Sequence, residues 1–184
     1  MPMKIGRGSR IMIELLMDDD LEDNLDSGDS AQECAEFDAE AMRAAVVAAC
    51  RVAGMAATAD AITLCIRLAG DEAVQALNSQ WRGKDRVTDV LSFPMQEPPI
   101  DLREPLGDIA LAYPFVWQEA ARLALTPAAH LVHLVVHATL HLLGYDHIDD
   151  GEALTMQRLE QQAMRQLGLH NPYPDLMTER PACS

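Results

Sequence analysis

The 184-residue chain has few cysteines and no long hydrophobic run. Its four cysteines lie far apart and include no CxxC pair, which is typical of reduced thiols in a cytosolic protein (Cys34, Cys50, Cys65 and Cys183). No apolar stretch reaches the roughly eighteen residues that a membrane span needs, and the first residues contain no hydrophobic signal segment. We therefore expect a cytoplasmic protein that has no disulfide framework and does not interact with a membrane.

Basic residues are also scarce. The chain has 14 Lys and Arg against 29 Asp and Glu, which gives a net charge of −15. Such a balance argues against RNA binding unless the acids are gathered in one place. Twelve of them lie between Glu14 and Glu40, where there is no Lys or Arg, and the remainder of the chain has 17 acids and 14 basic residues. Residues 18–33, DDDLEDNLDSGDSAQE, therefore predict an exposed, solvated acidic loop that is too poor in apolar residues to pack.

The order of secondary-structure patterns predicts the fold class. Strand patterns occupy residues 10–17, 61–68, 88–95 and 107–113. Helical patterns occupy 38–53, 71–81 and 114–124, and two further helices begin at the caps Thr126 and Asp149 and end at Gly144 and Gly168. Because the strands come mostly early and the helices late, we predict an α+β fold with a small mixed four-stranded sheet and about five helices.

The length and the hydrophobic content of 49% predict one folded domain with a substantial core. We place this domain at residues 10–174. Residues 1–9 are interpreted as a disordered leader, and residues 175–184 as an irregular tail. No internal repeat is visible.

Five of the six histidines fall in residues 126–150, TPAAHLVHLVVHATLHLLGYDHIDD. His137 and His141 are four residues apart, so both lie on one face of the predicted helix. His147 would point about 240° away on a continuing helix, and Gly144 permits the turn that could return it to the same place. Three imidazoles leave the fourth tetrahedral position open, as in a catalytic zinc site. We therefore predict one Zn²⁺ per chain, held by His137, His141 and His147 at the end of a central helix.

The neighbouring residues leave several interpretations open. His130 and His133 continue the histidine stripe, either lining a groove that leads to the metal or packing in its wall. Asp146 is either a turn residue or a hydrogen-bond partner of a metal-binding histidine. The spacing HxxxHxxGxxH is also that of metzincin peptidases, which place a Glu base directly after the first histidine. Ala138 occupies that position here, so a zinc metallopeptidase-like hydrolase remains an alternative that lacks its usual base.

Three segments together resemble one known family. The histidine segment HATLHLLGYDH resembles the signature of the YbeY family of bacterial endoribonucleases, which mature ribosomal RNA. Residues 78–94, NSQWRGKDRVTDVLSFP, resemble the second hallmark of that family, and residues 107–113 resemble its GDI strand. The resemblance covers roughly residues 10–174. It implies a four-stranded sheet with helices and a three-histidine metal in a cleft beside the sheet.

The same resemblance implies a function. It implies a single-strand-specific, metal-dependent endoribonuclease that acts on rRNA precursors, in maturation of the 16S rRNA 3′ end and in ribosome quality control. Arg82 matches the functionally important Arg of the family, which implies a catalytic role, and a guanidinium suits bidentate contact with phosphate. Lys84, Arg86 and His133 are expected to make weaker RNA contacts.

Two further questions concern partners and the role of the metal. The small ribosomal subunit or a ribosome-assembly GTPase is an expected partner. A binding module for such a partner, with mainly structural zinc, is a second alternative. Three protein ligands rather than four argue against purely structural zinc.

Overall fold

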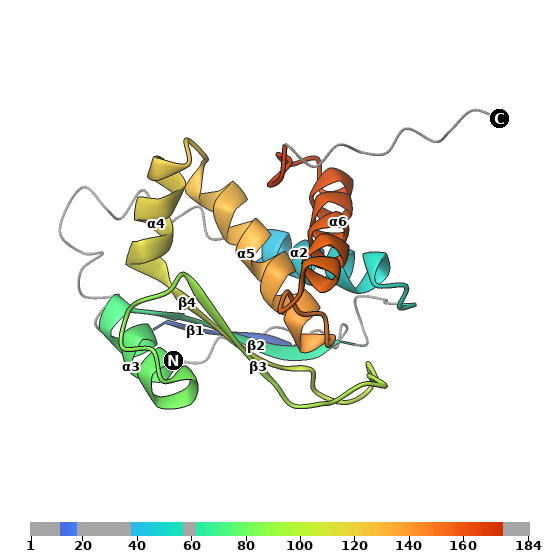
Figure 1. Ribbon diagram of the computed structural model, residues 1–184, viewed down its shortest axis with the longest axis horizontal. Coiled ribbons are helices and arrows are strands. Elements are labelled where there is room, and N and C mark those ends of the chain that lie inside the picture. Colours follow the sequence, from blue (N-terminus) through green and yellow to red (C-terminus); the bar gives the residue numbers. More distant parts are fainter. Residues whose placement is uncertain (1–11, 18–37, 57–61, 175–184) are drawn as a thin grey trace.

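The computed structural model describes residues 12–17, 38–56 and 62–174. Four strands form one sheet in the order β1-β2-β4-β3 (Figure 1): β1 (Met12–Met17), β2 (Thr63–Ala69), β3 (Val90–Pro94) and β4 (Gly107–Ala112). Strand β2 pairs parallel with both β1 and β4, whereas β3 pairs antiparallel with β4 at the sheet edge. The predicted mixed four-stranded sheet is thus confirmed.

The described part of the chain contains five helices, as expected: α2 (Ala39–Val52), α3 (Asp71–Arg82), α4 (Tyr113–Arg122), α5 (Pro127–Leu142) and α6 (Asp150–Gln166). Figure 1 shows α2, α5 and α6 together on one side of the sheet and α3 on the other. This arrangement confirms the α+β class. It also places α5, the histidine helix, between the sheet and the other two helices of that layer.

The sheet buries a large apolar face under α5 and a smaller one under α3. Alternate residues of β2, namely Leu64, Ile66 and Leu68, join the main core with α2, α5 and α6. Full burial of each such side chain contributes roughly 1.5–3 kcal/mol. The face under α3 is lined by smaller side chains, such as Ala110 and Ala112 of β4. The larger core therefore fixes the position of α5.

The end of α5 lies close against the sheet. Gly107, the first residue of β4, has a φ of +142°, a conformation that glycine adopts readily. A Cβ at Gly107 would overlap the carbonyl oxygen of Phe93 and lie 3.0 Å from Cδ2 of Leu142, the last residue of α5. The C-terminal end of α5, which carries His141, is therefore packed on the β3–β4 end of the sheet.

Two predicted strands are shorter than expected. The strand at 88–95 is reduced to Val90–Pro94, because the Asp89 carboxylate accepts hydrogen bonds from the Thr88 hydroxyl and the Val90 N–H and so fixes a local turn. Tyr113, the last residue of the strand expected at 107–113, instead begins α4, where Pro114 occupies the first turn and the Asp71 carboxylate accepts the Phe115 N–H at 3.1 Å.

Several expectations concern residues outside the described ranges. These are the leader at 1–9, the acidic loop at 18–33, the tail at 175–184 and the first residues of two predicted strands, 10–11 and 61. Among the described residues, no single helix is long and apolar enough to cross a membrane, and only α4 and α5 together, bent by 113°, reach the required length and hydropathy.

Candidate metal centre

Helix α5 has a single open stripe, and that stripe carries histidines. The Thr126 hydroxyl caps the helix by accepting the Ala129 N–H at 3.2 Å, and Pro127 occupies the first turn. Most of the following side chains are buried in the core: Leu131, Val132, Leu134, Val135, Val136, Ala138 and Leu140. His133, His137 and His141 remain partly exposed, four residues apart. The apolar residues of the helix therefore direct these three rings to the same open side.

The turn after α5 returns the chain to this open side. The Gly144 N–H donates to the His141 carbonyl and the Tyr145 N–H donates to the Leu140 carbonyl, both at 3.0 Å. This pair of bonds is the Schellman motif, which requires a left-handed residue, and Gly144 has a φ of +89°. A Cβ at Gly144 would lie 2.7 Å from Cγ of Pro98. Glycine is therefore needed here both for its conformation and for its size.

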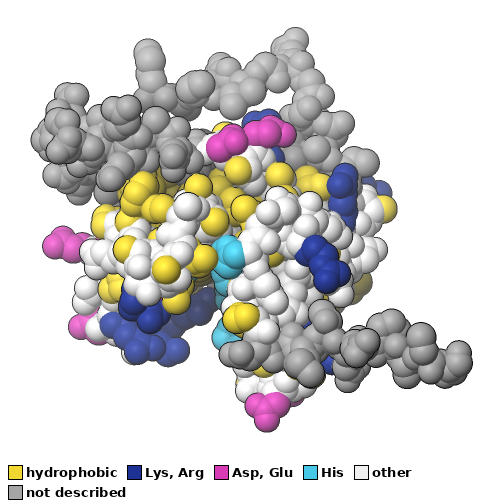
Figure 2. All heavy atoms as spheres, turned by 90° about the horizontal axis from the view of Figure 1, so that it is seen from above, with side chains coloured by type: hydrophobic (Ala, Val, Ile, Leu, Met, Phe, Trp, Pro, Cys, Tyr) yellow, Lys and Arg dark blue, Asp and Glu magenta, His cyan; other side chains and the backbone are white. Residues whose placement is uncertain are grey.

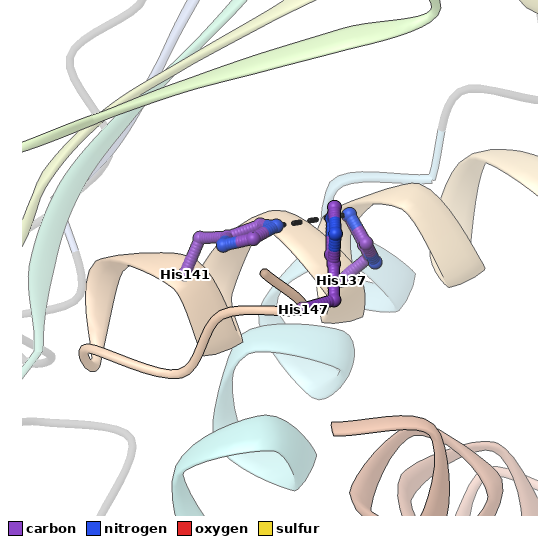
Figure 3. Close-up of side chains that lie close together, drawn as sticks. All are labelled: His137, His141 and His147. Carbon is purple, nitrogen blue, oxygen red and sulfur yellow. Dashed lines mark hydrogen bonds between the residues drawn. The ribbon is translucent and has the colours of Figure 1, made fainter. Parts of the chain in front are cut away.

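His137, His141 and His147 meet at one place (Figure 3). The Nε2 atoms of His137 and His141 are 3.2 Å apart, and one ligand nitrogen from each of the three residues lies within 4.8 Å of the others. Zn–N bonds of 2.0–2.1 Å in a tetrahedral site place ligand nitrogens about 3.3 Å apart. The first pair already has that spacing. The exposed His147 ring is farther, with its centroid 5.6 Å from that of His137 and 5.0 Å from that of His141, against 4.7 Å between His137 and His141. The three residues therefore fit a metal ion.

Burial favours the neutral form of His141. Burial, followed by repulsion from His137 and His147, lowers the pKa of His141 to about 4, although the Asp146 carboxylate opposes this shift. A neutral imidazole is the form that binds a metal. The Asp146 carboxylate accepts the His147 N–H at 2.8 Å and lies 3.9 Å from Nδ1 of His141. Asp146 therefore stabilises the turn and also lies beside a candidate ligand.

Glu160 of α6 is a part of this site that the sequence analysis did not identify. Its side chain is 1% exposed, and it is hydrogen-bonded to His133 Nε2, His137 Nδ1 and the Tyr173 hydroxyl. Burial, the largest single influence, opposes its ionisation, but the hydrogen bonds and the electrostatic attraction of His133 and His137 together outweigh burial and lower its pKa to about 2. The sequence does contain a signal, because Glu160 lies four residues from both Met156 and Met164, which are buried on the same face. A charge inside an apolar stripe is normally paired.

The two other histidines of α5 have different environments. His130 is 4% exposed, and neither of its ring nitrogens has a hydrogen-bond partner among the described residues. His130 therefore packs inside the protein and does not line an open groove. His133 uses Nε2 to contact Glu160, and its side chain is 16% exposed. Only Nδ1 is left for the RNA contact expected of His133.

The basic residues lie at the end of α3 and not on the histidine helix. Arg82 ends the helix, Lys84 and Arg86 follow in the next turn, and all three are exposed. The buried Asn78 holds this turn, because its side-chain amide donates to the Arg86 carbonyl at 2.8 Å and its main-chain carbonyl accepts the Lys84 N–H at 3.3 Å. In the described ranges, no hydrogen bond or ion pair joins these three side chains to the histidines or to an acid.

The basic turn is linked to the edge strand. Trp81, the residue before Arg82, is 65% exposed and contacts Phe93 of β3 edge to face, with ring centroids 6.2 Å apart. Phe93 lies next to the point where α5 ends against the sheet. Figure 2 shows histidine side chains between two raised parts of the surface, with Lys and Arg side chains gathered beside them. The contact between Trp81 and Phe93 therefore places the basic turn against β3, the edge strand whose last residues lie beside the end of α5.

Position 138 adds to the case against a peptidase. Ala138 is 1% exposed and packs in the main core. Glu160 does not replace the missing base, since it bonds to Nδ1 of His137 and therefore lies on the side of the ring away from Nε2. Neither Ala138 nor Glu160 therefore supplies the peptidase base.

Comparison with known proteins gives consistent matches. A family model described as Endoribonuclease YbeY matches residues 28–168. Endoribonuclease YbeY of Rhodopseudomonas palustris (strain BisB18) is 45% identical over 145 residues, which cover 77% of this chain and 86% of that protein. The proteins of the same name from Azorhizobium caulinodans and Stutzerimonas stutzeri (strain A1501) are 48% and 47% identical over 111 and 121 residues. These matches cover 60% and 65% of this chain and 70% and 76% of those proteins.

Proposed function

This chain belongs to the YbeY endoribonuclease family, and from that membership we propose that it is a metal-dependent hydrolase that cleaves phosphodiester bonds of single-stranded RNA. The observation that carries the proposal is the cluster of three histidine nitrogens at the end of α5. Three protein ligands leave one tetrahedral position of the metal open to water or substrate, whereas a structural zinc site normally has four protein ligands. We take residues 10–174 as the catalytic domain.

The biological substrate we propose is an rRNA precursor, cleaved during maturation of the 16S rRNA 3′ end and during ribosome quality control. Family membership and the segment at 78–94, which resembles a hallmark of that family, support this choice. The small ribosomal subunit or an assembly GTPase is the proposed partner. The cytoplasm is the proposed location; Cys50 and Cys65, the two cysteines in the described ranges, form no disulfide bond.

His137, His141 and His147 would hold the metal, which we propose to be Zn²⁺. Nitrogen ligands in an approximately tetrahedral arrangement suit this ion. A zinc ion held there would supply Lewis acidity, which activates water near neutral pH and polarises a phosphate oxygen. The protein's own contribution is to keep His141 neutral and to hold His147 in place through the Gly144 turn.

Arg82 is proposed to contact the phosphate that is attacked. Its guanidinium can donate two parallel hydrogen bonds to a phosphate, and no described acid pairs with it. Lys84 and Arg86 would contact neighbouring phosphates, and the Asn78 bonds hold all three in a fixed turn. Such preorganisation favours binding, since little loop entropy is lost on contact with RNA.

The preference for single strands is supported by Trp81. An indole that is 65% exposed beside three cations offers an aromatic face to an unpaired base, and its contact with Phe93 fixes the ring. Stacking of a base on an aromatic side chain contributes about 1–3 kcal/mol and depends little on the base. Bases in a duplex are already stacked and cannot use such a platform.

The proposed role of Arg82 is tested by single-turnover cleavage of one RNA, with zinc measured on the same samples. Arg82→Glu should retain zinc and the fold but lose cleavage, and Arg82→Lys should lose most of it, because a point charge cannot make two parallel bonds. Arg51→Glu is a matched control, since Arg51 is also exposed in the last turn of a helix. Near-normal cleavage by Arg82→Glu would remove Arg82 from the proposed mechanism.

The stacking role of Trp81 is tested by binding to single-stranded and duplex RNA of equal charge. Trp81→Ala should weaken binding to the single strand by about 5- to 150-fold, whereas Trp81→Phe should retain most of it. Binding to the duplex should change little in either variant. Equal losses on both RNAs would show that Trp81 is only a structural support for the basic turn.

A further inference from the structure

Glu160 is an unusual group to bury. It is 1% exposed on α6, and its partners among the described residues are two histidines and a tyrosine, with no Lys or Arg. An ionised carboxylate is costly to place in the interior unless hydrogen bonds and charges compensate it. The residues that compensate it include a candidate metal ligand, His137. The position of Glu160 therefore needs an explanation in terms of the metal centre.

The hydrogen bonds of Glu160 determine where the protons of its partners lie. An ionised carboxylate only accepts, so each partner must donate. Oε1 accepts from Nδ1 of His137 at 3.0 Å, and Oε2 accepts from Nε2 of His133 and from the Tyr173 hydroxyl. His137 is then protonated at Nδ1 and has its lone pair at Nε2. That Nε2 is the atom 3.2 Å from Nε2 of His141, inside the candidate metal site.

We propose that Glu160 is a positioning residue for the metal centre, which fixes the tautomer and the ring orientation of His137 so that Nε2 faces the ion. A histidine ligand commonly donates its other N–H to a carboxylate in this way, and the contact also makes the ligand nitrogen more basic. Glu160 acts through His137 and not on the substrate. The negative charge of Glu160 further offsets the positive charge of an ion held by three neutral rings.

The segment after α6 keeps Glu160 in place. Gln161 donates to the Asn171 side chain at 3.0 Å and to the Tyr173 carbonyl at 2.8 Å, and the Asn171 side chain accepts the Tyr173 N–H at 2.9 Å. These bonds fold the chain back over α6 and bring the Tyr173 hydroxyl to Glu160. Burial and the neighbouring Glu160 charge raise the pKa of Tyr173, so its hydroxyl stays protonated and keeps donating.

The inference rests on the proposed metal centre but not on RNA as its substrate, so the probe is Zn²⁺ itself. Zinc affinity is measured by competition with a chromophoric chelator. Glu160→Gln keeps the shape but removes the charge, and Glu160→Ala removes the acceptor, so we expect zinc binding to weaken about 10-fold and about 100-fold. The control is Glu152→Gln, the same charge change at an exposed position of α6, which should bind zinc like the wild type.

A second measurement reports the positioning role directly. In the metal-free wild type, ¹⁵N NMR of the histidine rings should show His137 protonated at Nδ1, and in Glu160→Ala this preference should be lost. Circular dichroism confirms the fold of each variant, and Glu160→Gln suffices if Glu160→Ala does not fold. Wild-type zinc affinity in Glu160→Gln, or His137 protonated at Nε2 in the wild type, would overturn the inference. Absence of zinc binding by the wild type would instead overturn the proposed metal centre.

Discussion

Replacing Gly144 by Ala should damage the metal centre without touching a histidine. A left-handed conformation costs an alanine about 1–2 kcal/mol, and Gly144 has a φ of +89°. The new Cβ would also lie 2.7 Å from Cγ of Pro98, a ring that cannot rotate away. Alanine also lowers the conformational entropy of the unfolded chain, which offsets about 0.4–1 kcal/mol of this destabilisation. A net destabilisation on the order of 1–2 kcal/mol follows, which lowers the melting temperature by about 2–8 °C for a domain of this size.

The more specific consequence concerns zinc. If the turn relaxes to relieve the contact with Pro98, His147 moves away while His137 and His141 stay in place on α5. Zinc at about 100 times its dissociation constant should stabilise the wild type by about 2.7 kcal/mol. In Gly144→Ala this gain should be much smaller. Thermal unfolding with added zinc and with a chelator measures both effects on the same protein.

Gly168→Ala is the matched control for Gly144→Ala. Gly168 follows α6 and is also left-handed, with a φ of +71°, but a Cβ there would have no atom within 4 Å. The control therefore shares the backbone cost and lacks the contact with Pro98. We expect a smaller loss of stability and an unchanged response to zinc. If the two variants have the same melting temperature and the same zinc response, the assigned role of the Gly144 turn is wrong.

Three further perturbations test other parts of the structure. His147→Ala should lose most of its zinc and its RNA cleavage, whereas His130→Ala should retain both, because His130 is buried away from the cluster; elemental analysis and a cleavage assay on the same samples decide this. The metal-free protein should lose up to about 3 kcal/mol of unfolding free energy as the pH falls from about 6.5 to about 4. The pKa of His141, lowered to about 4 mainly by burial, makes the unfolded chain take up the proton first. Urea unfolding at pH 7 and pH 5 should show a weaker pH dependence for His141→Gln. Deleting residues 18–33 should leave zinc content unchanged and raise RNA affinity modestly at low salt, since acids that repel phosphate are removed; a deletion that unfolds the protein would show that the segment packs.

The features that the sequence predicts well are local. The cap at Thr126, the turn at Gly144 and the four-residue spacing of His137 and His141 all depend on neighbours in the chain. Helix geometry converts such spacing directly into a shared face for His137 and His141, and Gly144 permits the turn that returns His147 to them. The fold class follows from the order of strand and helix patterns for the same reason.

The features that the sequence does not predict depend on packing between distant segments. Glu160 reaches His137 across 23 residues, because α6 packs beside α5, and Tyr173 reaches Glu160 across 13 residues. From the sequence alone His133 is expected to be an exposed neighbour of the site, whereas in the structure its Nε2 is hydrogen-bonded to the buried Glu160. The location of Arg82 on the α3 side of the sheet is equally a matter of topology. The spacing of residues along a single helix does not predict such contacts between different elements.

The position of the metal centre late in the chain has a consequence for biosynthesis. All four strands end by Ala112, whereas the three histidines lie between residues 137 and 147, and Glu160 and Tyr173 come later still. Domains form as the chain emerges from the ribosome, at roughly 5–20 residues per second. At that rate all four strands are synthesised about 1.5–6 seconds before the end of α5, the helix that covers their apolar face. During that interval Leu64, Ile66 and Leu68 lack the cover of α5 and the chain has no place for a metal, so the complete centre can form only after Tyr173 has been made.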